Sequence, residues 1–445
     1  MAARERRPPG RDMTDTTAAP PSRTQGTGLA FAYVTTLFFA WGFATSLIDP
    51  LIAAVRKVFD LSTAEAMLTA SAWFIAYAVV SVPAAAVLGK LGYSRSIISA
   101  LAVMVLGCLI VPVATIVDWY PGVLVALFVI ASGVTLLQVA ANPLVAALGS
   151  RKSSHARLNF SQFFNSLGTT VGPWLGSTVL LTGGVFAAGA VVTAATRDES
   201  LRSIDFAFLA LGGFFAVVAF FIFTARKKIN AAAAGADEGG GVASPLKAFG
   251  SKWALFGAAA IFIYVGSEVT IGGLLTNFLH SPTILNIPEA DAGRMVSLYW
   301  GGAMVGRFIG ALLLTRVRAG VLLTVNTTIA AVLCLVVTQT TGETAAYAAI
   351  AVGFFNSIMF PTIFTLTLER SGAPASATSG LLCTAIVGGA VLPYIAGHLV
   401  DDAAAVFNPA FYVPLAGYIL LTVFALACAR SKVRETDVVA APSSH

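Results

Sequence analysis

The sequence predicts an all-α membrane protein with twelve transmembrane helices in two pseudo-symmetric six-helix bundles. Three observations support this fold class. Hydrophobic residues make up 57% of the 445 residues and charged residues only 11%, whereas a soluble chain has roughly 25% charged residues. Apolar segments of about 20 residues, the length that crosses a bilayer, recur along the whole chain. Finally, the second half of the chain repeats short patterns of the first half in the same order.

Hydropathy places the twelve predicted spans at 29–54, 66–89, 95–117, 121–149, 158–184, 205–225, 253–279, 291–315, 319–339, 343–368, 375–400 and 407–430. The segment Ile229–Gly250 is rich in Ala and Gly, which is typical of a flexible linker. We therefore predict a disordered cytoplasmic tail (1–28), an N-terminal bundle (29–225), a cytoplasmic linker (226–252), a C-terminal bundle (253–430) and a second cytoplasmic tail (431–445).

The positions of Lys and Arg predict the orientation. Most of the 27 basic residues fall in the tails, the linker and the loops on the same side. The loops on the opposite side carry only Arg56, Lys57, Arg197, Arg202 and Arg294. Because basic residues concentrate on the cytoplasmic side of a membrane protein, we expect both termini in the cytoplasm.

The repeated patterns predict where a transported molecule would bind. Ser71-Ala-Trp-Phe is followed by Lys90, as Ser297-Leu-Tyr-Trp is followed by Arg316. The segment 168–173, which begins with Gly and ends with Pro, matches the segment 388–393. Parallel repeats of this kind put a substrate site near the middle of the membrane, between the two halves.

Three charged side chains lie deep in apolar spans: Asp49, Glu268 and Arg307. A charge in hydrocarbon is costly and usually faces a protein interior or a wet cavity, so each is a functional candidate. Asp49, one turn after Thr45, can bind and release a proton; the alternative is a structural carboxylate at the helix break before Pro50. Glu268 is the second proton candidate. Arg307 is a structural charge that could pair with Glu268, although their estimated depths differ by several residues.

Buried amides supply candidate ligand contacts. Gln138 and Asn142 are four residues apart, and Gln162 and Asn165 are three apart, so each pair shares one face of its helix. Asn356 is a fifth candidate. Neutral amides suit polyhydroxylated ligands, but they also serve as hydrogen bonds between helices, and this alternative stays open for Asn142 and Asn356 above all.

Other chemistry is not indicated. The four cysteines lie singly in apolar segments, and His155, His280 and His398 lie at span ends without metal-ligand partners. We therefore expect no metal and no cofactor. No paired aspartates, His-rich metal spacing or Gly-x-Ser-x-Gly pattern indicates an intramembrane enzyme, and the scattered basic residues do not indicate nucleic-acid binding.

Four motifs together resemble the major facilitator superfamily and, within it, the fucose–proton symporter family of bacterial sugar transporters. They are the segments 138–143, 158–168, 299–310 and 355–362, within a similarity that runs over residues 31–425. The resemblance implies alternating access and monosaccharide uptake driven by protons. Asp49 corresponds to the helix-1 aspartate of the family, and Gln162 and Asn165 to its polar helix-5 positions.

Two departures from fucose permease bear on the substrate. Gln138 replaces a glutamate, and Glu268 stands where fucose permease has no acid, as in the glucose/galactose or N-acetylglucosamine branches. The resemblance thus implies a proton symporter for such a hexose, and we expect it in a bacterial inner membrane. As an aromatic side chain, Trp300 is a candidate to cover a ring face of the sugar. We expect the proton, the sugar and membrane lipid as partners, and a monomer. An uncoupled facilitator, a fucose permease and a non-transporting sugar sensor are the alternatives.

Overall fold

The computed structural model describes residues 23–47, 51, 54, 57–60, 63–180, 184–186, 193–233, 244–400 and 406–431. Its helices are α1 (Arg23–Ser46), α3 (Thr63–Ile116), α4 (Tyr120–Ala147), α5 (Ser154–Leu180), α6 (Ala194–Ala233), α7 (Lys252–His280), α8 (Glu289–Leu313), α9 (Ala319–Gln339), α10 (Gly342–Asn356), α11 (Met359–Arg370), α12 (Ala375–Thr384), α13 (Gly388–Gly397) and α14 (Tyr412–Arg430). Short 3-10 turns are η1 (Arg151–Ser153), η2 (Gly184–Phe186), η3 (Pro245–Gly250), η4 (Ala385–Val387) and η5 (Asn408–Phe411).

The helices account for the twelve predicted crossings. Within the described residues, 10 helical stretches are long and apolar enough to span a membrane. One of them, Ala72–Ile116, has 45 residues, which is too long for a single crossing. It turns at Gly92, whose φ of 73° suits a residue without a side chain, and so supplies two crossings. Helix α5 completes the set; its Ser, Gln, Asn and Thr residues lower its hydropathy.

Helices α1 and α6 extend well beyond their predicted boundaries. Helix α1 begins at Arg23, before the expected start at 29. Helix α6 runs from Ala194 to Ala233 rather than over 205–225, so it takes up Arg226–Ala233 from the predicted linker. Hydropathy marks only the apolar centre of a helix. Alanine, arginine and lysine are good helix formers, and they extend α6 beyond that centre without any hydropathy signal.

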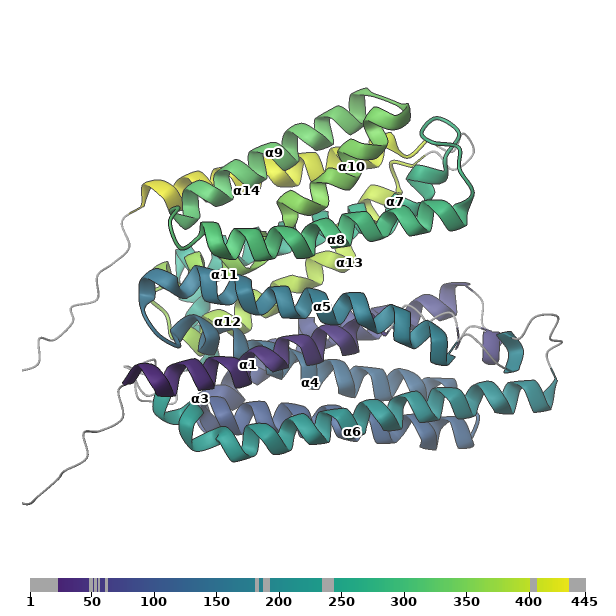
Figure 1. Ribbon diagram of the computed structural model, residues 1–445, viewed down its shortest axis with the longest axis horizontal. Helices are drawn as coiled ribbons and strands as arrows, with labels where there is room; N and C mark the ends of the chain where they lie inside the picture. Colours follow the sequence, from purple (N-terminus) through teal and green to yellow (C-terminus); the bar gives the residue numbers. More distant parts are fainter. Residues whose placement is uncertain are drawn as a thin grey trace, which may run out of the picture.

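The crossings run along the long axis of the molecule and form two groups, one above the other in Figure 1. One group contains α1, α3, α4, α5 and α6, and the other contains α7 to α10 and α14. Contacts of α5 with α8 and α11, and of α12 with α3 and α4, join the two groups. The start of α1 and the end of α14 lie at the same end, which we call the terminal end (Figure 1).

Glycines at matching positions pack the two groups in the same way. A side chain on Gly168 of α5 would collide with the Phe39 carbonyl of α1. At the repeat position, a side chain on Gly388 would collide with the Phe262 carbonyl of α7. Close approach of helices through small residues is typical of membrane proteins. The first and seventh crossings therefore have equivalent neighbours, as the repeated sequence patterns predict.

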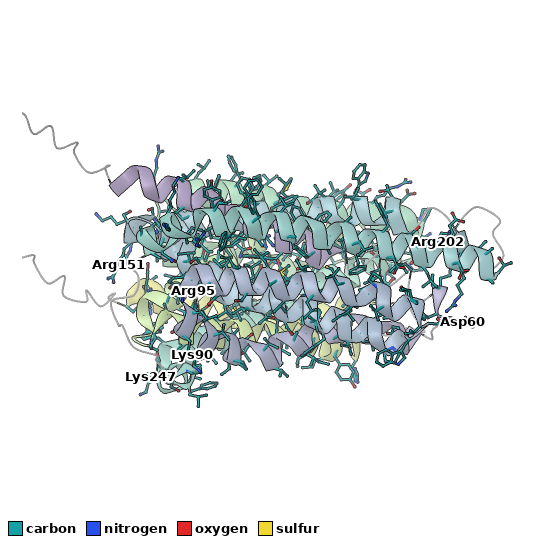
Figure 2. All side chains as sticks on the ribbon, turned by 90° about the horizontal axis from the view of Figure 1, so that it is seen from below. Asp60, Lys90, Arg95, Arg151, Arg202 and Lys247 are labelled. Atoms are coloured by element: carbon teal, nitrogen blue, oxygen red, sulfur yellow. The ribbon has the colours of Figure 1, made fainter. Side chains whose placement is uncertain are left out.

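Charged and apolar side chains are distributed as in a membrane protein. Figure 2 shows Lys90, Arg95, Arg151 and Lys247 at the terminal end and Asp60 and Arg202 at the opposite end. Between the ends, large apolar side chains such as Phe206 (65% exposed) and Phe220 (64% exposed) point outward. Such an apolar surface on a soluble monomer would be unusual. All four cysteines are buried and unpaired, consistent with their reading as core residues.

Candidate functional site

Asp49, the first proton candidate, lies outside the described residues, as does Pro50. Thr45, one turn earlier, donates its hydroxyl hydrogen bond to the Trp41 carbonyl, 2.6 Å away in its own helix. The role of Asp49 therefore stays a prediction. The two other membrane charges are described in full, and they lie together.

Glu268 and Arg307 form a buried ion pair within the second group of helices. Glu268 Oε1 lies 3.8 Å from an Arg307 terminal nitrogen, and the side chains are 14% and 12% exposed. The same carboxylate oxygen accepts a 2.7 Å hydrogen bond from the Tyr264 hydroxyl. Because Tyr264 and Glu268 are four residues apart on α7, one helical turn aligns them. The pairing that the sequence left open is present in the structure.

Arg307 also satisfies the backbone at a helix break. Pro361 in α11 has no N–H, so the carbonyl four residues earlier, that of Ser357, loses its usual helical partner. Helix α10 ends at Asn356 and α11 begins at Met359. Arg307 Nε donates a 3.1 Å hydrogen bond to this Ser357 carbonyl. The guanidinium group is thus held by the break as well as by Glu268.

The third contact of Arg307 crosses to the other group of helices. Its Nη1 donates to the hydroxyl of Ser166 in α5. Ser166 in turn donates a 3.2 Å hydrogen bond to the Gln162 carbonyl. Beside this contact, the rings of Phe163 in α5 and Phe308 in α8 have centroids 5.5 Å apart. One charged and one aromatic contact therefore join α5 and α8.

The predicted amides of α5 have different surroundings. Asn165 donates a 3.1 Å hydrogen bond to the Phe38 carbonyl of α1, so it ties these two helices together. Gln162 is 5% exposed, and no hydrogen bond joins its side-chain amide to another described residue. An amide without a protein partner is available to a ligand. Gln162 is therefore the more direct ligand candidate of the two.

The amides of α4 also differ from each other. Gln138 donates to the Tyr77 hydroxyl of α3, which makes Tyr77 part of any ligand site that Gln138 lines. Asn142 is fully buried, and neither its nitrogen nor its oxygen has a hydrogen-bond partner among the described residues. A buried unpaired amide costs about 1–3 kcal/mol per group. Asn142 therefore stays a candidate ligand residue, with no partner among the described residues.

Asn356 belongs to a polar network inside the second group. Its amide nitrogen donates to the Tyr299 hydroxyl at 2.7 Å, and its amide oxygen accepts from Tyr418 at 2.6 Å. The Tyr299 hydroxyl contacts the Glu268 carbonyl at 3.3 Å. Since both ends of the Asn356 amide have protein partners, this geometry favours the structural alternative for that residue. The neighbouring Trp300 is 42% exposed.

A second junction between the two groups lies at the terminal end. His155 of α5 contacts Glu369 of α11 at 3.2 Å and the Thr365 hydroxyl at 2.6 Å. Ser379 of α12 donates to the Val139 carbonyl of α4 at 2.8 Å. The sequence offers no partner for His155, because Thr365 and Glu369 are distant in the chain. These contacts hold the terminal end closed in this structure.

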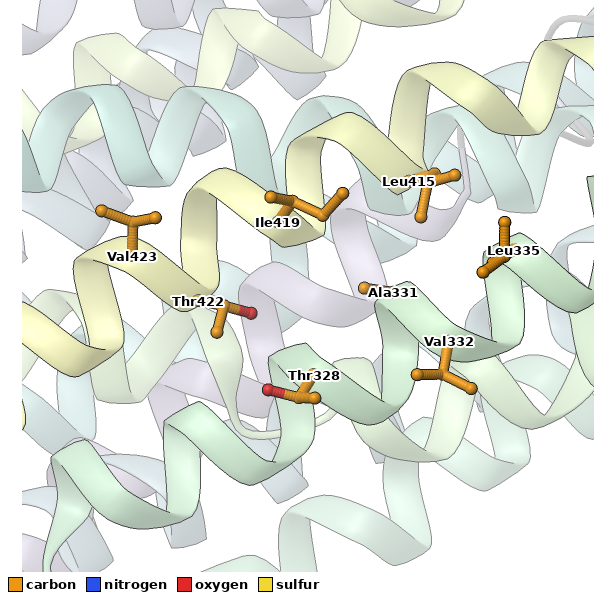
Figure 3. Close-up of a pocket in the computed structure, with 8 residues that line it drawn as sticks. All are labelled: Thr328, Ala331, Val332, Leu335, Leu415, Ile419, Thr422 and Val423. Atoms are coloured by element: carbon orange, nitrogen blue, oxygen red, sulfur yellow. The ribbon is translucent and has the colours of Figure 1, made fainter.

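The groove in Figure 3 has a mostly apolar lining, unlike the two polar junctions. It lies between α9 and α14, and Thr328, Ala331, Val332, Leu335, Leu415, Ile419, Thr422 and Val423 line it. Several of these side chains are about half exposed, and none is charged. Its polar side chains are those of Thr328 and Thr422, and it has no carboxylate that could carry a proton. The described part of the chain also contains no group of three or more His, Cys, Asp or Glu residues that could hold a metal ion.

Comparison with known proteins gives a consistent result. The model of the Major Facilitator Superfamily matches residues 33–382. The chain is 40% identical to a glucose/galactose transporter of Brucella abortus over 408 residues, which cover 91% of this chain and 95% of that protein. It is 30% identical to the L-fucose-proton symporter of Escherichia coli strain K12, over 89% of this chain and 92% of that protein.

The fold comparison agrees with the sequence comparison. A crystal structure of the Major Facilitator Superfamily transporter FucP in the outward conformation superposes with a TM-score of 0.80 at 25% identity. The match covers 91% of this chain and 100% of that one.

Proposed function

The chain belongs to the Major Facilitator Superfamily, in the family of the glucose/galactose transporters and L-fucose–proton symporters, and we propose that it imports a monosaccharide together with a proton by alternating access. The observation that carries this proposal is the junction of α5 and α8. There, an ion pair that can change its protonation state contacts the helix that bears Gln162 and Asn165. A proton and a neutral polyhydroxylated ligand thus have candidate sites on adjoining elements.

We propose a glucose- or galactose-type hexose, or N-acetylglucosamine, as the substrate. The 40% identity over nearly the full length of a protein named glucose/galactose transporter supports the first two sugars. The proposed sugar contacts are Gln162, Asn165 and Gln138, with Trp300 on a ring face and Asn142 reached after the helices separate. Asp49 and Glu268 are the proposed proton carriers, and Asn356 a supporting residue.

The distribution of charges supports a membrane orientation. The concentration of basic residues at the terminal end favours an orientation with both termini in the cytoplasm. The bacterial relatives favour the inner membrane as its location. The described closure at His155 and Glu369 would then face the cytoplasm, so this structure is closed on the inside. The protein would act as a monomer, since one chain contains both bundles.

The test is uptake of labelled D-glucose into vesicles that contain the purified protein, with the outside made acidic. We expect accumulation above the external concentration, and loss of that accumulation when a protonophore is added. Competition by D-galactose, N-acetylglucosamine and L-fucose ranks the substrates. Equilibration without accumulation would identify a facilitator instead, and binding without exchange would identify a sensor.

A further inference from the structure

We propose that Arg307 is a positioning residue that transmits the protonation state of Glu268 to the sugar-binding face of α5 through the hydroxyl of Ser166. This inference rests on the proposed function, because it concerns how the proton and the sugar influence each other. It gives Arg307 a role in coupling proton binding to sugar binding, whereas the sequence predicted a purely structural role.

The contacts form an unbroken path. The ionised Glu268 attracts one terminal nitrogen of Arg307 across 3.8 Å, while the other donates to Ser166. The Ser166 hydroxyl then donates to the Gln162 carbonyl, one turn earlier on α5. Ser166 is 3% exposed, so water offers little competition for its hydroxyl. The path therefore runs from a titratable carboxylate to the backbone of a candidate sugar residue.

The same segment of α5 also contacts α1. Asn165, next to Ser166, donates to the Phe38 carbonyl, and a side chain on Gly42 would collide with Asn165. The backbone around Ser166 is thus fixed on one side by α1 and on the other by Arg307. A change in the position of Arg307 is transmitted to α5, because these helices are closely packed.

Few other groups could produce the same response. Among the described residues, the titratable or charged groups that act on Glu268 are Tyr264 on α7, and Arg307 and Tyr299 on α8. Tyr418 of α14 and Cys334 of α9 act on Tyr299 in turn. Tyrosine and cysteine stay neutral in a buried apolar site at neutral pH. Glu268 is thus the group in this cluster whose charge changes, and Arg307 is its charged neighbour.

Protonation of Glu268 removes the negative partner of Arg307. The guanidinium keeps its charge, since arginine does not lose its proton in proteins. It is then held by the Ser357 carbonyl and the Ser166 hydroxyl alone, and the constraint on α5 changes. Because coupling between two binding sites is reciprocal, a proton that improves sugar binding is itself bound more tightly when sugar is present. Symport needs this positive coupling.

The test measures sugar affinity at two pH values in the purified full-length protein, with D-glucose and D-galactose as probes. The readout is the ratio of the Kd at about pH 8 to the Kd at about pH 6; one coupled proton can change it by at most about 100-fold over this range. We expect a ratio above about 10 for the unchanged protein. Ser166→Ala should lower the ratio at least about threefold, and Glu268→Gln should bring it further toward one.

Ser132→Ala is the matched control. Its hydroxyl also lies in the first group of helices but donates to the Phe128 carbonyl of its own helix, so the ratio should be unchanged. Ser166→Thr keeps the hydroxyl and should retain the response. If Ser166→Ala does not fold, Ser166→Cys is tested instead. Its thiol is a weaker acceptor than a hydroxyl, so it should also lower the Kd ratio at least about threefold.

Three outcomes overturn the inference. A Ser166→Ala or Ser166→Cys protein with the ratio of the unchanged protein would show that Ser166 does not carry the coupling. An unchanged protein that transports sugar with no pH dependence of affinity would contradict the inference but leave sugar transport intact. If the unchanged protein neither binds nor transports any of the tested sugars, the proposed function fails, and the inference fails with it.

Discussion

At the scale of single residues, the buried pair of Glu268 and Arg307 determines what each side chain can do. Both charged groups are largely buried, and each has hydrogen-bond partners beyond the other: Tyr264 for the carboxylate, and Ser357 and Ser166 for the guanidinium. A buried pair adds little net stability compared with apolar residues, but breaking it leaves one charge uncompensated. The two residues therefore depend on each other.

This dependence predicts a non-additive pair of substitutions. Glu268→Gln leaves a buried guanidinium without its anion, and we expect a loss of about 3–5 kcal/mol of stability, typical of a broken buried pair. The double variant Glu268→Gln/Arg307→Met should recover part of that loss, because no unpaired charge remains. Thermal unfolding of the purified variants measures both. Strictly additive effects would show that the two charges do not interact.

The amides separate into ligand candidates and structural residues in a testable way. Gln162 has no side-chain partner among the described residues, whereas Asn356 is bonded to two tyrosines. Gln162→Ala should therefore weaken sugar binding by about 5- to 150-fold, equivalent to about 1–3 kcal/mol for one lost hydrogen bond, with little change in stability. Asn356→Ala is the comparison and should lower stability more than affinity. Sugar binding and thermal unfolding measure both effects. If Asn356→Ala mainly weakened binding and Gln162→Ala mainly lowered stability, Asn356 would be the ligand residue and Gln162 the structural one.

At the scale of helices, α5 connects most of the functional contacts. Its first turn holds His155 against Glu369, its middle holds Ser166 against Arg307, and Gly168 packs on α1. The amide of Asn142 on α4 has no hydrogen-bond partner among the described residues. Polar contacts of α5 and α12 join the two groups of helices at the terminal end. Polar contacts of this kind suit elements that must separate during each transport cycle.

These contacts predict that removing the Glu369 carboxylate opens the terminal end. Glu369→Ala deletes the contacts to His155 and Ser154, so spin labels on Lys152→Cys and Arg316→Cys should move apart. The four native cysteines are buried and should not be labelled. Asp291→Ala removes an exposed ion pair within α8 and serves as the control. Equal distance distributions for Glu369→Ala and the control would exclude this contact as part of the closure.

At the scale of the whole molecule, the sequence predicted the crossings better than the contacts between them. Apolar length identified the spans, and helical spacing identified the shared face of Gln162 and Asn165. Neither signal predicts contacts between the two groups of helices. Arg307 and Ser166 are 141 residues apart in the chain, and His155 and Thr365 are 210 apart. Periodicity describes neighbours on one helix, so these junctions became visible only once the helices were placed.

The break at Pro361 shows the same limit. Proline predicts a freed carbonyl, but not the residue that satisfies it; in the structure this residue is Arg307. The sequence likewise marked Glu268 and Arg307 as costly charges without deciding whether they meet. Both questions depend on the relative depth of separate helices, which hydropathy gives only to within several residues.

Sugar-induced proton movement tests the central claim most directly. Vesicles containing the protein and an internal pH-sensitive dye are given D-glucose or D-galactose outside, with no pH gradient at the start. Proton–sugar symport predicts that the interior becomes acidic when sugar is added, and that Glu268→Gln reduces this signal more than Ser132→Ala does. Entry of labelled sugar with no acidification would contradict proton coupling and leave an uncoupled carrier.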